Sequence, residues 1–529
     1  MFIREKHRKN KDGSVTTYLQ LVESQRVDGR SRQKVLSTLG RKDDPRLGKH
    51  LSGLVTTAAR YARLTTLLLE QGMTAETQVW GPELVWRRVW EETVGPLVEE
   101  ALGGGRLSQA AYLMILHRLV DPGSKCAAFR FASDVYGAGF EKVELHDLYH
   151  ALDLLAEKKE TIERAWFLQE RDLFTGTDLV YFDTTSSYLE GSHPEGLAQF
   201  GYSRDHRGDR RQLAVGVVVT REGLPIAHLV LPGATADPRA FEEAIRYLKE
   251  TLGVEKVIVC ADRGVVSSQT VTALREAKLE YILATRMRRD EASQEALSRA
   301  GRYHEIEERL WVKEVAVEEG EDRRIVCYNP AAAEEDKRER EALVAHLEER
   351  VAAGTTRSLL RGAARRYVRT AGGTVTLDRE KIESDARYDG KWVLRTNTAL
   401  STADVAQAYK GLWRVEQAFR TLKTPLELRP IYHWTQKRIR GHLVVCFLAF
   451  LLRTMLKQRL DDAGWEGSFT AVLEDLARVR AVTIAAANGE RYRMRDEIPA
   501  SLLPVFHALK IASPRRLEKL DGPPPDGEA

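Results

Sequence analysis

Hydrophobic and polar residues alternate with a period of two over much of the first 40 residues, and this spacing is typical of β-strands. We therefore predict a small β-hairpin module over residues 1–48. From about residue 50 the apolar positions recur every three or four residues, which predicts a helical N-terminal domain over 49–175. DNA binding and simple packing against the rest of the chain are both consistent with this pattern.

β-branched and aromatic residues become frequent at residue 178, where Leu179-Val-Tyr-Phe-Asp-Thr-Thr is typical of a buried strand. The succession of periods that follows predicts an α/β fold with a mixed sheet, whose first part we assign to residues 176–289. The predicted elements after the first strand are strands 212–220 and 224–231, helix 238–252, strand 257–262, helix 267–278 and strand 281–284.

The chain is β-rich and more polar over residues 290–398, and we interpret this part as an insertion that interrupts the core. Helical spacing returns over 399–460, with long helices predicted at 402–423 and 436–460. Residues 461–529 are predicted to form a C-terminal helical segment with a disordered tail.

The composition is that of a globular protein, with 43% hydrophobic and 30% charged residues, and 529 residues are enough for several domains. Lys and Arg (81) nearly balance Asp and Glu (77), so the local distribution of charge is more informative than the total. Residues 357–369 contain five arginines and no acid, and residues 409–440 contain eight Lys or Arg and two Glu. Two such clusters favour a polyanionic partner such as DNA, although a solvated helix face would explain either cluster alone.

Three features of the sequence bear on the cellular compartment. Cys126, Cys260, Cys327 and Cys446 are far apart and favour a reducing environment. The N-terminus is basic and lacks the apolar centre of a secretory signal. The apolar run 443–452 is shorter than the roughly 18 residues that a membrane helix needs. We expect a cytoplasmic, nucleoid-associated protein without membrane contact.

Two aspartates belong to predicted core strands, Asp183 inside one strand and Asp262 at the end of another. An ionised carboxylate inside an apolar strand costs several kcal/mol unless a partner compensates it. Carboxylates from two strands that converge at one edge of a sheet would form a site for a divalent metal ion. The alternative for each aspartate alone is a structural role, pairing with a nearby arginine or capping a helix.

Glu416 lies in the predicted helix 402–423, midway between Tyr409 and Lys423. Helical residues seven positions apart differ by only about 20° around the axis, so we expect all three side chains on one face. A carboxylate between a tyrosine and a lysine suits a metal ligand flanked by two contacts to DNA phosphates. The alternative is a solvated surface helix, which the neighbouring Trp413 disfavours.

The cutting and joining of DNA explains why three carboxylates would be needed. Both reactions are in-line displacements, in which two divalent ions activate the attacking oxygen and stabilise the leaving oxygen. Mg²⁺ prefers oxygen ligands and keeps several waters, so carboxylates from separate elements suffice. The predicted cofactor is two Mg²⁺ ions, for which Mn²⁺ can substitute, held by Asp183, Asp262 and Glu416.

The sequence resembles the insertion-sequence DDE transposases, which have an RNase H-like core and the signature Tyr-x2-Arg-x3-Glu-x6-Lys. Tyr409, Glu416 and Lys423 fall at the signature spacing, whereas Leu412 occupies the position of the signature arginine. The 154-residue separation of Asp262 and Glu416 fits the β-rich insertion of that family. Further stretches that resemble the family are 181–186, 201–237, 257–264 and 429–442.

The resemblance implies a transposase that acts as a homodimer on double-stranded DNA. Such an enzyme binds the inverted-repeat ends of its element, hydrolyses the DNA there and transfers the strands to a target. The residues that the resemblance and the basic run of the insertion suggest as DNA contacts are Tyr409, Lys423, Arg420, Arg263, Arg365 and Arg366.

Two related functions remain open on the sequence alone. One is an RNase H-like nuclease without strand transfer, and the other is a catalytically silent, transposase-derived DNA-binding protein. Leu412 favours the silent protein, and the presence of all three acids disfavours it. A metabolic α/β enzyme is disfavoured because no P-loop or G-x-G-x-x-G motif follows a predicted strand.

Overall fold

The computed structural model describes most of the chain. The described residues are 2–9, 15–27, 30–42, 44, 47, 74–137, 139–171, 178–191, 196–201, 203, 206–254, 257–315, 322–353, 362–371, 374–485 and 490–520. The predictions for helical residues 49–73, for the arginines before residue 362 and for the C-terminal tail after residue 520 lie outside these residues.

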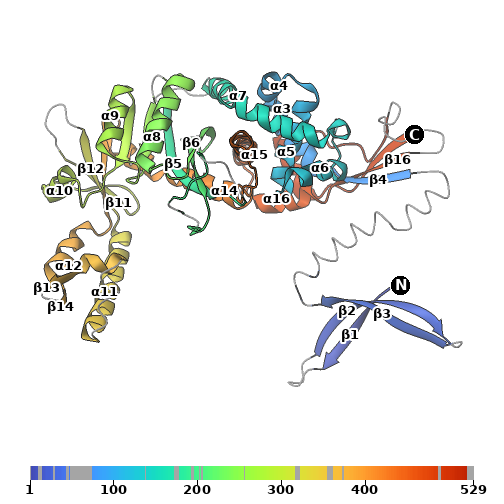
Figure 1. Ribbon diagram of the computed structural model, residues 1–529, viewed down its shortest axis with the longest axis horizontal. Coiled ribbons are helices and arrows are strands. Elements are labelled where there is room, and N and C mark those ends of the chain that lie inside the picture. The colour runs from blue at the N-terminus through green and yellow to red at the C-terminus, as the bar shows by residue number, and fades with distance from the viewer. Residues whose placement is uncertain are drawn as a thin grey trace.

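A nine-stranded mixed sheet organises the central part of the molecule, in the order β10-β11-β12-β15-β9-β8-β5-β6-β7 (Figure 1). Strand β5 (Asp178–Tyr188) lies inside the sheet, antiparallel to β6 (Gln212–Thr220) and parallel to β8 (Val257–Ala261). Strand β7 (Pro225–Pro232) pairs with β6, and β9 (Glu280–Ala284) is parallel to β8. The predicted mixed α/β fold is confirmed.

The helices between these strands follow the predicted order. Helix α8 (Asp237–Arg246) continues into a π-helical turn (Tyr247–Thr251). Helix α9 (Ser268–Glu276) begins at a capping box, in which Ser267 and Thr270 satisfy each other's backbone amides. Apolar residues of α8 and α9 cover one face of β5 and β8, so the sheet is buried on this side.

Strands from the predicted insertion extend the same sheet. Strands β10 (His304–Glu307), β11 (Leu310–Val315) and β12 (Arg323–Tyr328) form an antiparallel meander, and β15 (Lys391–Thr396) joins it to β9. The apolar side chains on one face of these strands belong to the same hydrophobic cluster as Tyr181 and Cys260, and Val315, Val326 and Val393 form a second, smaller cluster. The β-rich region between the two parts of the predicted core thus continues the central sheet.

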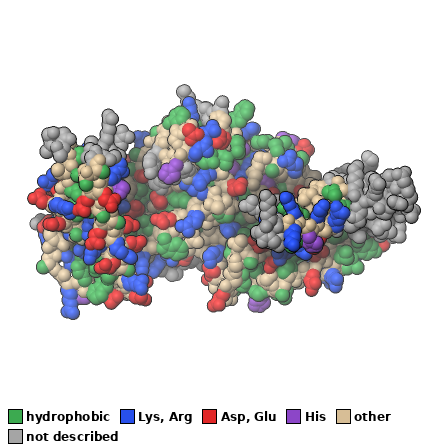
Figure 2. Space-filling model, turned by 90° about the horizontal axis from the view of Figure 1, so that it is seen from below, with side chains coloured by type: hydrophobic (Ala, Val, Ile, Leu, Met, Phe, Trp, Pro, Cys, Tyr) green, Lys and Arg blue, Asp and Glu red, His purple; other side chains and the backbone are tan. Residues whose placement is uncertain are grey.

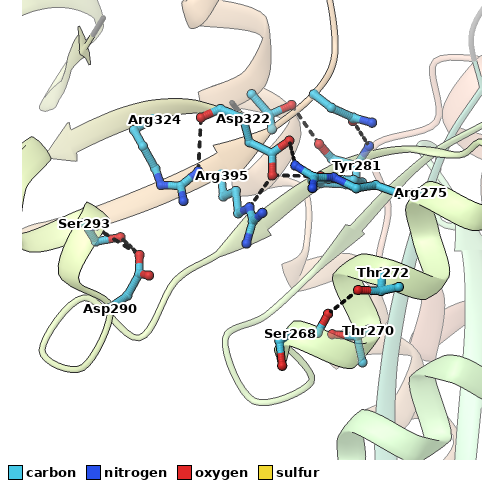
Figure 3. A network of polar contacts seen from close by, with 12 residues as sticks. Ser268, Thr270, Thr272, Arg275, Tyr281, Asp290, Ser293, Asp322, Arg324 and Arg395 are labelled. Atoms are coloured by element: carbon cyan, nitrogen blue, oxygen red, sulfur yellow. Dashed lines mark hydrogen bonds and ion pairs between the residues drawn. The ribbon is translucent and has the colours of Figure 1, made fainter. Parts of the chain in front are cut away.

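Asp322, just before β12, joins this extension to the core (Figure 3). Its buried carboxylate accepts hydrogen bonds from the Tyr281 hydroxyl at 2.8 Å and the Arg275 guanidinium at 2.9 Å, and it pairs with Arg395. Burial alone would raise the pKa of Asp322, but the hydrogen bonds from these three residues outweigh it and lower the pKa. One ionised side chain thus ties together β9, α9 and β15.

A small lobe projects from the end of the sheet extension (Figure 1). Its small hydrophobic cluster contains Leu347 and Tyr367, and the rest of its long helix is largely exposed. Acidic and basic side chains are interspersed at this end of the molecule (Figure 2). The elements of this region are α10 (Glu291–Ser298), α11 (Pro330–Ala352), the 3₁₀ turn η3 (Gly362–Tyr367), β13 (Val368–Ala371), β14 (Thr374–Leu377), α12 (Arg379–Asp385) and the 3₁₀ turn η4 (Ala386–Tyr388).

The long helix α15 (Gln436–Asp462) lies between the sheet and the helices that precede it in sequence (Figure 1). By length and composition it is apolar enough to cross a membrane, but 78% of its most apolar stretch is buried inside the protein. It contacts β7, and the Arg440 side chain donates a hydrogen bond to the Val230 carbonyl there. The helical elements that precede the central sheet in sequence are α3 (Gly81–Glu92), α4 (Gly95–Leu102), α5 (Gly105–Val120), α6 (Lys125–Asp134), the 3₁₀ turn η1 (Phe140–Lys142) and α7 (Leu145–Arg171).

The helix predicted over 402–423 is divided into α13 (Thr402–Lys410) and α14 (Trp413–Lys423). At the junction the Leu412 amide donates to the Tyr409 carbonyl three residues earlier, which is the tighter 3₁₀ pattern. The prediction of one continuous helix is therefore wrong.

Two smaller sheets use strands from the ends of the chain. The first contains β1 (Phe2–Lys9), β2 (Val15–Val27) and β3 (Arg30–Arg41), one strand more than the predicted hairpin. The second has the order β18-β17-β16-β4, so the C-terminal segment predicted to be helical also contains strands. Its elements and their neighbours are β4 (Thr74–Val79), α16 (Phe469–Leu476), β16 (Arg480–Ala485), β17 (Arg491–Arg495), the 3₁₀ turn η5 (Ala500–Leu502), α17 (Leu503–Ala508) and β18 (Leu517–Leu520).

Candidate active site

Asp183 and Asp262 occupy matching positions on neighbouring parallel strands. The register pairs Phe182 of β5 with Ala261 of β8, and each aspartate is the next residue in its chain. Neighbouring strands are about 4.8 Å apart, so the backbones of the two aspartates lie side by side. The sequence predicted this convergence from two buried strands that carry acids.

Both aspartates are on the face of the sheet that α13 and α14 cover. Side chains alternate along a strand, so Asp183 shares its face with Tyr181, and the register extends this face to Asp262. The Tyr181 hydroxyl donates a hydrogen bond of 2.8 Å to the carbonyl of Ala408 in α13. Helix α14 contacts β5 and β6. The two carboxylates are thus on the side where Glu416 is carried.

The junction between α13 and α14 lies very close to β5. A Cβ atom on Gly411 would lie 1.9 Å from the Tyr181 hydroxyl oxygen, so only glycine permits this close approach of the helix to β5. Glu416 and Lys423 share α14, but Tyr409 belongs to α13. The expectation of one helical face for all three residues is therefore wrong, because the helical phase is broken at residues 411–412.

Glu416 lies in the first turn of α14, and its side chain is exposed. Within the part of the chain that the structure describes, no hydrogen bond or ion pair involves its carboxylate. Arg420, one turn further along, is also exposed, and Lys423 is partly exposed at the end of the helix. The exposed side of α14 therefore carries one acid followed by two bases.

Tyr409 contacts an acid of the site directly. Its hydroxyl donates a hydrogen bond of 2.9 Å to Asp262 Oδ1. Burial and the adjacent Asp262 carboxylate raise the pKa of Tyr409, so the hydroxyl stays protonated and remains a donor. The resemblance suggested Tyr409 as a DNA contact, and here the side chain holds Asp262 in place.

Asp237 is a carboxylate near the site that the sequence did not single out. Its Oδ1 accepts a hydrogen bond of 2.7 Å from the Thr184 hydroxyl, and the Thr184 amide donates to Asp183 Oδ1 at 2.7 Å. Asp237 Oδ2 is 3.8 Å from the point where a Cβ on Gly264 would lie, close to the loop after Asp262. As the first residue of α8, Asp237 looked like an ordinary acid at a helix N-terminus, which is favourable without any further role.

The chemistry of the donor set suits a divalent metal ion. Asp183, Asp262 and Glu416 offer hard carboxylate oxygens from three elements, the ligand type that Mg²⁺ prefers. Among the described residues, no three His, Cys, Asp or Glu side chains are gathered closely enough to ligate one ion. The structure thus places the two aspartates side by side on neighbouring strands, and it does not gather all three acids into one group among the described residues.

The remaining basic candidates lie in two regions. Arg263 is exposed directly after Asp262, in a loop whose carbonyls accept hydrogen bonds from Arg286. Arg365 and Arg366 lie in the lobe, at η3. Arg366 pairs with Asp385 at 3.4 Å and stacks on its neighbouring tyrosine, whereas Arg365 is exposed without an ion pair in the described chain.

Comparisons with known proteins identify similarity to transposases. Residues 3–66 match the N-terminal domain of IS1634 family transposases, and residues 175–452 match the transposase DDE domain. A sequence comparison with curated proteins found no match. Among solved structures, the piggyBac transposase synaptic complex with hairpin DNA is 8% identical, covering 75% of this chain and 79% of that one with a TM-score of 0.38.

A second solved structure, the Mos1 transposase paired-end complex with the left transposon end, is 14% identical. The match covers 32% of this chain and 57% of that chain, with a TM-score of 0.15.

The DDE-domain match spans more than half of the sequence and contains Asp183, Asp262 and Glu416. Residues 3–66 are similar to the N-terminal domain of IS1634 family transposases, and the chain as a whole belongs to the DDE transposases.

Proposed function

We propose that this transposase cuts DNA at the inverted-repeat ends of its element and joins the freed ends to a target, using Asp183, Asp262 and Glu416 as its acidic residues. The observation that carries the proposal is the pair of aspartates at matching positions on β5 and β8, on the face covered by α13 and α14. Three carboxylates from three elements are a suitable donor set for two-ion phosphoryl transfer.

The proposal divides the chain as follows. Residues 176–289 and 399–460 form an RNase H-like core, and residues 290–398 lie between its two parts. The helical region 49–175 is a candidate for binding DNA. The strand order β7-β6-β5-β8-β9, with the two aspartates on its inner strands, supports this assignment of the core. The module 1–48 and the segment 461–529 flank it.

Each residue of the site has a separate task. When bound, a pair of Mg²⁺ or Mn²⁺ ions would activate the attacking oxygen and stabilise the leaving oxygen. The Thr184 amide orients Asp183, and the Tyr409 hydroxyl orients Asp262 through Oδ1. Glu416, exposed on α14, supplies the third carboxylate.

DNA contacts are proposed along the exposed side of α14 and around the aspartates. Arg420 and Lys423 follow Glu416 by one and two turns, and Arg263 follows Asp262. Leu412, at the position of the signature arginine, is only 8% exposed and packs in the core, so this chain lacks that contact. Arg365 and Arg366 would hold a DNA end from the lobe. We further propose a cytoplasmic homodimer on paired DNA ends.

The test uses the full-length protein and duplex DNA carrying the sequences that flank its gene. We expect metal-dependent cutting and joining by the wild type. Cutting should fall by more than about a hundredfold in each of Asp183→Asn, Asp262→Asn and Glu416→Gln. This is more than the usual loss of activity when a residue that only supports a metal ligand is removed. Glu466→Gln is the matched control, because this carboxylate is exposed between α15 and α16 and makes no ion pair with the residues that the structure describes.

The outcomes separate the related functions. Cutting without joining by the wild type would identify a nuclease, and binding without cutting in Mg²⁺ or Mn²⁺ would identify a silent DNA-binding relative. Unchanged cutting by the three acid variants would overturn the assignment of the site.

A further inference from the structure

The segment between α14 and α15 exposes two aromatic rings. In Arg429-Pro-Ile-Tyr-His-Trp-Thr435, Ile431 is 1% exposed, Tyr432 is 64% exposed and Trp434 is 78% exposed. Trp434 is the most exposed large hydrophobic side chain in the described part of the molecule. The alternation places Tyr432 and Trp434 on the solvent side of the segment, and Ile431 and His433 toward the protein.

The backbone that carries these rings is held on both sides. The Ile431 amide donates to the Tyr188 carbonyl at 3.3 Å, and the Glu190 amide donates to the Ile431 carbonyl at 3.0 Å. The next inward residue, His433, lies with its ring 5.4 Å from that of His442 in α15. Exposed rings on a fixed backbone lose little conformational entropy when they bind a flat ligand.

The position of the segment relative to the acids points to the ligand. Tyr188 is five residues beyond Asp183 on β5, and a strand rises about 3.3 Å per residue, so Ile431 is bonded to β5 about 17 Å from Asp183. Stacked nucleotides are about 3.4 Å apart, so this span corresponds to roughly five nucleotides of a DNA strand.

The surroundings are charged rather than aliphatic. Arg429 precedes the rings, and Lys437 and Arg438 follow them in the first turn of α15, where they pair with Glu157 and Asp153 of α7. No aliphatic side chain of residues 429–438 is among the exposed large hydrophobics of the described chain. Two exposed rings without aliphatic neighbours fit the flat face of a nucleic-acid base better than an apolar protein surface.

We propose that Tyr432 and Trp434 form a stacking platform for unpaired bases of the DNA, about five nucleotides from the scissile phosphate. The inference rests on the proposed function, since it takes the acid site as the point of cutting. A fully paired duplex hides its base faces, so stacking on these rings requires bases that are splayed or unpaired. The substrate that this surface favours is therefore an element end that has opened locally.

The test compares two fluorescent DNA probes with the full-length protein, without metal and at one fixed salt concentration. One probe is a complete duplex of the gene-flanking sequence, and the other has the same sequence with five terminal base pairs unpaired. We expect Tyr432→Ala and Trp434→Ala each to weaken binding to the open probe by about 5- to 150-fold, the range given by base stacking on a ring, with little change for the duplex.

Conservative variants and a control make the result specific. Tyr432→Phe and Trp434→Phe keep a ring and should bind the open probe nearly as well as wild type, whereas Trp434→Leu should not. Leu517→Ala, which removes a 59% exposed apolar side chain on β18, should change neither affinity.

Equal binding by wild type and alanine variants would overturn the platform while leaving the proposed function intact. An equal loss on both probes would overturn the stacking of unpaired bases. Failure of the wild type to bind either probe would instead contradict the proposed function itself.

Discussion

Thr184 connects two carboxylates at the site. Its backbone amide binds Asp183 and its hydroxyl binds Asp237, so a change at Asp237 is transmitted to Asp183 through one residue. The buried strands that carry Asp183 and Asp262 could be predicted from the sequence because each strand is locally apolar. Asp237 could not, because its role depends on a hydrogen bond across 53 positions of the chain.

We predict that Asp237 is a positioning residue for Asp183. Asp237→Asn and Thr184→Val should slow cutting by about 10- to 100-fold, the usual effect of removing a residue that holds a metal ligand in place. Both variants should also need a higher Mg²⁺ concentration for half-maximal cutting. Thr184→Ser keeps the hydroxyl, so its cutting rate and its Mg²⁺ concentration for half-maximal cutting should be close to those of the wild type. A slower reaction with an unchanged Mg²⁺ requirement and a lowered Tm would mean that Asp237 is only structural.

At the scale of elements, the junction of α13 and α14 sets where Tyr409 and Glu416 stand relative to each other. The helical period of apolar residues runs without interruption through residues 402–423, so the sequence predicted a single helix. The junction lies against Tyr181, which is 230 positions earlier in the chain and meets the helix only after β5 is in the sheet. Local periodicity carries no information about such a contact.

We predict that Gly411→Ala lowers the free energy of unfolding by about 1–3 kcal/mol, because the added methyl group overfills the contact with Tyr181. It should also reduce cutting, since α13 and α14 carry different residues of the site. Urea unfolding and the cutting assay measure the two effects. Gly208→Ala is the matched control, because a Cβ there has no neighbour within 4 Å. Equal stability of the two variants would contradict the close contact between Gly411 and Tyr181.

At the scale of the whole molecule, a buried polar cluster joins the helical part to the sheet. Glu163 of α7 binds the His228 ring nitrogen at 2.6 Å, the Tyr247 hydroxyl at 2.6 Å and the Lys159 ammonium at 2.7 Å. Burial alone would raise the pKa of Glu163, but Lys159 and His228 outweigh it and lower the pKa to about 2. The sequence predicted the helix and the strand but not their connection, since the partners are 65 and 84 positions from Glu163.

We predict a loss of stability in acid that depends on Glu163. Its pKa is lower in the folded state than its ordinary value of 4.5, so the unfolded chain takes up the proton first as the pH falls. The stabilisation is complete above pH 4.5 and disappears between about pH 4.5 and 2, and the shift corresponds to about 3 kcal/mol. Tm values of wild type and Glu163→Gln should converge over this interval. A constant difference in Tm across it would contradict the assignment.

The pairing of β4 with β16 has a consequence for how the protein is made. Val79 pairs with Arg480, so strand β4 leaves the ribosome some 400 residues before its partner strand. At a synthesis rate of about 5–20 residues per second, this edge waits roughly 20–80 seconds without its partner. An unpaired strand edge can pair with other chains, so a nascent transposase, or one terminated before β16, is exposed to aggregation through β4.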